Sequence, residues 1–103
     1  MYEENIKRIE AEIRSFEAHM KSLNAAIETT KEILNEIRAG LSSVSAAANA
    51  SGRPFSSEER QLYLDDIKRC HDDIAAMFGA GFEMKKNRDQ LKVNLEILRK
   101  RNV

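Results

Sequence analysis

The sequence predicts an all-α protein, a long antiparallel coiled-coil hairpin in which two helices lie side by side. In the first half of the chain, apolar residues recur at alternating steps of three and four for almost six heptads. The second half repeats this spacing less regularly, and the single proline, close to a glycine, separates the halves. At 103 residues the chain has room for one domain. We therefore expect a single helical-hairpin domain over residues 1–103.

The first helix is expected over residues 2–48. A sustained repeat of 3.5 residues specifies helices that wind left-handedly around a partner, with the repeated positions facing that partner. Thr30 is the one polar residue among the twelve positions of this seam. The first-helix seam consists of Ile6, Ile9, Ile13, Phe16, Met20, Leu23, Ile27, Thr30, Leu34, Ile37, Leu41 and Val44.

A turn is expected over residues 50–56. Gly52 can end a helix in the left-handed conformation, and Pro54 keeps the residue before it out of the helical region. Ser56, followed three residues later by Glu59, has the spacing of a capping box that begins the second helix. A connection this short makes the two helices antiparallel neighbours.

The second helix is expected over residues 57–101. Two glycines, Gly79 and Gly81, each cost about 1 kcal/mol in a helix interior and allow a bend, or a break that would give three helices. We favour a continuous but bent helix. Alternatively, residues 79–81 face residues 24–26 across the hairpin, so that small residues let the backbones approach closely. The second-helix seam consists of Tyr63, Ile67, Cys70, Ile74, Met77, Gly81, Met84, Arg88, Leu91, Leu95 and Leu98.

Four apolar residues of the second helix form a stripe beside its seam, and we call them the apolar stripe: Phe78, Phe82, Val93 and Ile97. Leu62 and Leu64 are also apolar and off the seam. The stripe could widen the hairpin core, or it could dock a second copy or another helix. We favour docking, because the first helix has too narrow an apolar face to cover both the seam and the stripe. We expect a homodimer that forms a four-helix bundle, with a helical protein client as a further partner.

No motif in the sequence predicts catalysis. The chain lacks a phosphate-binding glycine loop, a Gly-x-Ser-x-Gly elbow, a Cys-x-x-Cys pair and a His-Glu-x-x-His helix. Residues 70–73, Cys-His-Asp-Asp, are metal-binding types, but consecutive helical residues point about 100° apart and cannot converge on one ion. We therefore expect no enzyme activity, no catalytic, cofactor-binding or metal-binding residues and no cofactor, and we interpret Cys70 as a packed seam residue.

The charges give no bulk attraction to nucleic acid or membranes, because 17 basic and 17 acidic residues cancel. Residues 83–103 carry a net charge of +4, seven bases less three acids, and residues 1–20 carry −2, three bases less five acids. We favour pairing of these segments across the hairpin, and nucleic-acid binding is the alternative.

The sequence also indicates where the protein resides. No apolar run reaches the length of a membrane span, the N-terminus lacks the features of a signal peptide, and the one cysteine suits a reducing compartment. A cytoplasmic protein is expected, and export without a cleaved signal stays open.

One region resembles the helical spoke of bacterial flagellins and hook-associated proteins. The segments concerned are Glu28–Ile37, Ala46–Gly52, Ser57–Leu62 and Asp65–Ile74: a helix that ends in an Ala/Asn/Gly turn, then a helix with paired acid–Ile steps. The resemblance covers about half of the chain. The Asn-Gly-Thr turn, the Phe-Asn-Gly exit and the long terminal helices of that family are missing, and we interpret the resemblance as convergence rather than kinship. It implies an exported structural, filament-type helical protein.

Together these features predict a non-catalytic helical protein–protein interaction module: an adaptor, a small chaperone or an assembly scaffold. A chaperone that shields an amphipathic helix of a client, as in specialised secretion systems, is the specific form that we favour. An exported filament-type protein and a nucleic-acid-associated helical regulator are the alternatives.

Overall fold

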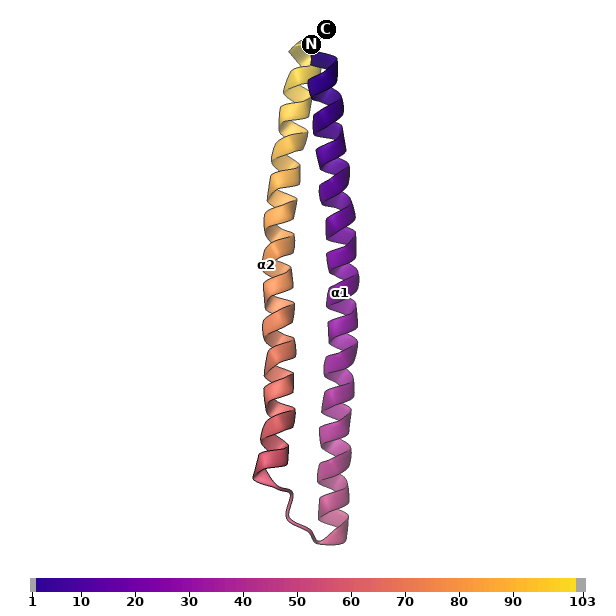
Figure 1. Cartoon of the computed structure of the whole chain (residues 1–103), viewed down its shortest axis with the longest axis vertical. Helices are drawn as coiled ribbons and strands as arrows, with labels where there is room; N and C mark the ends of the chain where they lie inside the picture. Colours follow the sequence, from indigo (N-terminus) through magenta and orange to yellow (C-terminus); the bar gives the residue numbers. More distant parts are fainter. Residues whose placement is uncertain (1, 102–103) are drawn as a thin grey trace. The chain divides into compact units, whose positions relative to one another are not determined.

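The computed structural model describes residues 2–101, which form two helices joined by a short turn (Figure 1). Helix α1 spans Tyr2–Ser51 and helix α2 spans Ser57–Arg101. The two helices form a hairpin, and no strand occurs within the described residues. The predicted all-α hairpin is therefore confirmed, and α1 continues three residues beyond its expected end. Dimerisation into a four-helix bundle stays a prediction.

Helix α1 ends in a left-handed glycine, as the sequence predicts. Gly52 has a φ of 70°. Its N–H donates to the carbonyl of Asn49 (3.3 Å), and the N–H of Arg53 donates to the carbonyl of Ala48 (3.0 Å). These two bonds define a Schellman motif, which satisfies carbonyls that the end of a helix would otherwise leave without a donor.

Helix α2 begins at a serine cap. The Ser56 hydroxyl accepts a hydrogen bond from the N–H of Glu59 (3.4 Å), and the Ser56 carbonyl accepts one from the N–H of Arg60 (3.0 Å). The first of these is the hydrogen bond that the predicted capping box requires at its N-cap residue.

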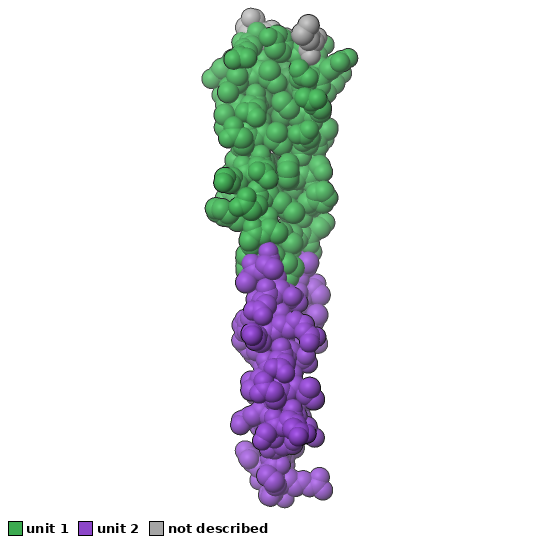
Figure 2. Space-filling model, turned by 60° about the vertical axis from the view of Figure 1, so that its left-hand side comes forward, with its two compact units in different colours: residues 1–25, 77–103 green, residues 26–76 purple. Residues whose placement is uncertain are grey.

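The chain divides into two compact units, each made from a segment of both helices (Figure 2). Unit 1 contains residues 1–25 and 77–103, and unit 2 contains residues 26–76. The most buried side chains of unit 1 are Ile13 and Leu95. The expectation of a single domain stays a prediction.

Unit 2 has its own buried side chains, Ile27, Leu34 and Cys70. All three belong to the predicted seams. Cys70 is a free thiol, only 8% exposed, and it packs as the sequence predicted.

Burial along both helices follows the predicted seams. Every seam position is buried or half-buried, and in α2 every other residue is exposed. Thr30 fits its half-buried seam position because its hydroxyl donates to the carbonyl of Ala26 (2.9 Å), which satisfies the polar group locally. The 3.5-residue repeat therefore identified the packed face of each helix.

Helix α2 is continuous through Gly79 and Gly81, so the three-helix alternative is wrong. The proposed contact of residues 79–81 with residues 24–26 is also wrong. Gly79 is exposed, and a Cβ built there would have no heavy atom within 4 Å. A Cβ on Gly81 would lie 3.4 Å from Cδ2 of Leu23. The reason is the heptad phase: Gly81 alone of the three lies on the seam, where it faces a seam leucine.

Candidate protein-interaction surface

The apolar stripe lies in unit 1 and is exposed along its whole length. The exposed fractions are 55% for Phe78, 69% for Phe82, 52% for Val93 and 45% for Ile97. Steps of four residues separate the members of each end pair, so each pair lies along one ridge of the helix. The interpretation that this stripe widens the hairpin core is therefore wrong, because α1 does not cover it.

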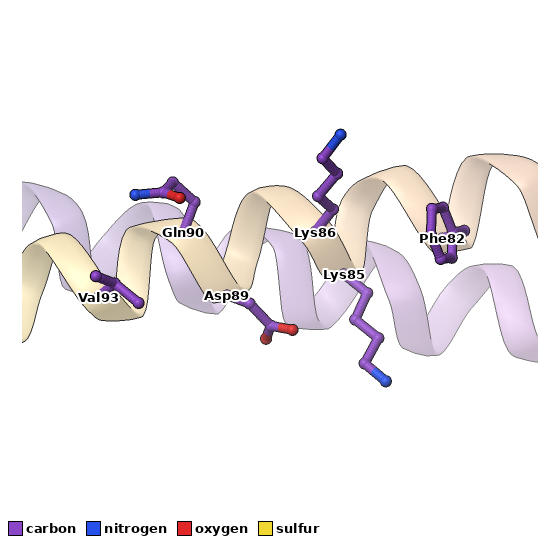
Figure 3. Close-up of a pocket in the computed structure, with 6 residues that line it drawn as sticks. All are labelled: Phe82, Lys85, Lys86, Asp89, Gln90 and Val93. Carbon is purple, nitrogen blue, oxygen red and sulfur yellow. The ribbon is translucent and has the colours of Figure 1, made fainter.

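An open groove occupies the middle of the stripe (Figure 3). Phe82 and Val93 lie at its two ends, and polar side chains line the length between them. In Figure 3, Lys85 and Asp89 point to one side of α2, and Lys86 and Gln90 point to the other. The surface thus alternates apolar ends with a charged centre, and all six residues that line it come from one helix.

Asp89 is held by its neighbour in the chain. Arg88, whose side chain is mostly buried in the seam, donates to Oδ1 of Asp89 from Nε (3.2 Å) and Nη2 (3.1 Å). Because both bonds end on Oδ1, the carboxylate retains Oδ2 for a second donor. Arg88 therefore holds an acceptor at the centre of the groove from a seam position.

No family model, curated protein or solved structure matches the chain. The surface itself therefore carries the functional argument.

The residues considered for metal binding do not form a cluster. Within residues 2–101 no group of three or more His, Cys, Asp or Glu side chains could hold a metal ion. Cys70 faces the seam, while the exposed His71 accepts a hydrogen bond at Nε2 from Nη2 of Arg38 (2.9 Å). An arginine has no acceptor, so this bond requires the proton of a neutral His71 on Nδ1.

The terminal segments of unit 1 pair their charges, as the structural interpretation of the sequence predicts. Glu17 lies 3.7 Å from the ammonium of Lys92, and Glu10 lies 3.3 Å from the guanidinium of Arg99. All four side chains are partly exposed, and pairs of this kind contribute about 0.2–1 kcal/mol each. They favour the antiparallel register without making a large contribution to stability.

Within residues 2–101, α1 and α2 are the two helices that could be considered as membrane spans. Neither helix is both long enough and apolar enough to cross a membrane.

Sequence reasoning identified the four apolar residues of the surface but missed its polar centre. From the sequence, Lys85, Lys86 and Asp89 counted only toward the net charge of residues 83–103. The sequence nevertheless places these residues on the face of the stripe. Steps of three, four and four lead from Phe82 through Lys85 and Asp89 to Val93.

Proposed function

We propose that this protein is a non-catalytic helical interaction module that binds its partner through the apolar stripe of α2. The exposure of Phe82 is the observation that carries the proposal, because this aromatic residue is 69% exposed one helical turn from the exposed Phe78, on the helix face that also carries Val93 and Ile97. Exposed apolar patches that polar residues border mark interaction sites on soluble proteins. A helical partner fits best, because pairs of apolar anchors one helical turn apart accept an amphipathic helix.

Burial of the stripe supplies a useful driving force. Complete burial of a large apolar side chain is worth about 1.5–3 kcal/mol. The fraction of Phe82 still exposed makes about 1–2 kcal/mol available, and Phe78, at 55% exposure, adds about 0.8–1.7 kcal/mol. These gains are of the size that interface anchors contribute, and they are absent from the isolated hairpin.

The same surface suits an adaptor, a small chaperone or an assembly scaffold. Each of these roles needs a stable helical support and an exposed apolar face, and none needs a reactive group. The hairpin supports the face because the seam residues, which are buried or half-buried, hold α2 against α1 while the stripe residues stay exposed.

Affinity capture with matched baits tests this proposal. The wild-type chain is compared with the Phe78→Asp/Ile97→Asp variant, in which charges replace both ends of the stripe. Capture from the native host, followed by reconstitution with the purified partner, should give a complex of fixed stoichiometry with the wild type only. Circular dichroism should show that the variant stays helical, because both positions are exposed.

Equal binding by the wild type and a helical Phe78→Asp/Ile97→Asp variant would refute the role of the stripe. Two other results would favour the alternative functions: growth of filaments from the purified chain, or salt-dependent retention on DNA. The Lys92–Glu17 and Arg99–Glu10 pairs support the interaction module over nucleic-acid binding, because acids already neutralise those two cations.

A further inference from the structure

The apolar stripe is symmetric about the midpoint between Asn87 and Arg88. Phe78 and Ile97 lie equally far from this point, and so do Phe82 and Val93, since the residue numbers of each pair sum to 175. The polar centre has the same midpoint, because the residue numbers of Lys85 and Gln90, and those of Lys86 and Asp89, also sum to 175. A surface whose two ends match end for end is self-complementary when a second copy lies across it in the opposite direction.

We propose that the occupant of this groove is a second copy of the chain, with the two α2 helices antiparallel and a two-fold axis passing beside residues 87 and 88. This inference rests on the proposed function and specifies its partner and register. In this register Phe82 of each copy meets Val93 of the other, and Phe78 meets Ile97. Every exposed apolar residue of the stripe then has an apolar residue opposite it.

The side of the groove on which each charge lies decides which charges meet in this arrangement. The two-fold axis runs across the groove, so it turns the copy end for end but keeps each side of the groove on its own side. Lys85 and Asp89 share one side, and Lys86 and Gln90 share the other (Figure 3). Lys85 of each copy therefore meets Asp89 of the other, and Lys86 meets the neutral Gln90.

Arg88 prepares this contact. Its two bonds to Oδ1 orient the Asp89 carboxylate and leave Oδ2 for the lysine of the second copy. The packing geometry is also ordinary. Residues at steps of four form inclined ridges, and packing such ridges against each other is the commonest class of helix contact in globular proteins.

Charge reversal tests this register directly. The Lys85→Asp variant places two carboxylates at each central contact of its homodimer, and Asp89→Lys places two ammonium groups there. Each single variant should dimerise about tenfold more weakly than the wild type, since the two central contacts of the dimer each change by about 0.5–1 kcal/mol. Lys68→Asp is the matched control, because Lys68 is exposed on α2 outside the groove and its substitution changes the net charge equally. This control should dimerise as the wild type does.

The decisive sample mixes the two single variants, each with a different tag. In a mixed dimer both central contacts join a carboxylate to an ammonium group, so the heterodimer should exceed the statistical half of all dimers by native mass spectrometry. The Lys85→Asp/Asp89→Lys double variant should also self-associate more tightly than either single variant, because both central contacts again join opposite charges. A statistical distribution of dimers, or single variants as tight as the wild type, would overturn the register.

This experiment separates the inference from the function on which it rests. A wild-type chain that stays monomeric, but binds another helical protein through Phe78 and Ile97, would refute the second copy and leave the interaction module intact. If the Phe78→Asp/Ile97→Asp variant keeps both its dimer and its binding to a client, the second-copy inference and the proposed function are both refuted.

Discussion

Replacement of Gly79 by alanine should stabilise the protein. Gly79 is an exposed residue in the interior of α2, and a Cβ at this position would meet no heavy atom within 4 Å. Its backbone is not in the left-handed region, since Gly52 is the residue with positive φ within the part of the chain that the structure describes. Alanine is therefore free of steric conflict, and its helix propensity exceeds that of glycine by about 1 kcal/mol.

Thermal unfolding followed by circular dichroism measures this effect. For a domain of this size, 1 kcal/mol corresponds to a rise in Tm of about 4–8 °C. Gly52→Ala is the opposite control, because its φ of 70° should make alanine lower the Tm. A Gly79→Ala variant with an unchanged or lower Tm would contradict a continuous α2 and would indicate that the helix is interrupted at residues 79–81.

Three further predictions concern the packing within the hairpin. Ile13→Ala should lower the free energy of unfolding by about 2–5 kcal/mol in urea titrations, because Ile13 is 7% exposed, and a loss near zero would mean that the seam is not packed. Cys70→Ala should reduce stability modestly without changing partner binding, and rapid labelling of the native thiol would contradict the burial of Cys70. With Cys70 replaced, cysteines at positions 17 and 92 should be joined by a short bifunctional thiol crosslinker, whereas crosslinks that fit only a parallel pairing of helices would contradict the hairpin.

Much of the fold follows from local sequence signals. The 3.5-residue repeat identified the seam in both helices, including polar members such as Thr30 and Arg88, because a helix rotates every position predictably. The turn was equally readable. Gly52 and Ser56 act through backbone hydrogen bonds a few residues away, and the expected motif needs no knowledge of distant contacts.

Contacts across the hairpin were harder to predict, because they depend on the exact register between the helices. The alternative in which residues 79–81 face residues 24–26 placed Gly79 opposite small residues, whereas the seam phase places Gly81 against Leu23. Gly40 is a second example. It is half-buried outside the predicted seam, where a Cβ would lie 3.5 Å from Cε1 of Tyr63. Gly40 and Tyr63 thus face each other across the hairpin, although the heptad pattern alone does not pair them.

The candidate surface was predicted only in its apolar part. Phe82 and Val93 stand out by composition, but Lys85 and Asp89 resemble any solvated pair on a helix. The structure shows that they line the groove between Phe82 and Val93. The heptad pattern predicts which residues of a helix are exposed in the hairpin, but it does not identify the partner that binds them.

The most direct test of the stripe is the self-affinity of Phe82→Ala compared with that of Leu62→Ala. The two side chains are almost equally exposed on the same helix, at 69% and 66%, but only Phe82 belongs to the stripe. Loss of about 1–2 kcal/mol at each of the two copies should raise the dimer Kd about 30- to 1000-fold in sedimentation equilibrium. Leu62→Ala should leave the Kd unchanged, and both variants should stay helical. Equal Kd values for Phe82→Ala, Leu62→Ala and the wild type would contradict the assignment of the stripe as the surface through which two copies associate.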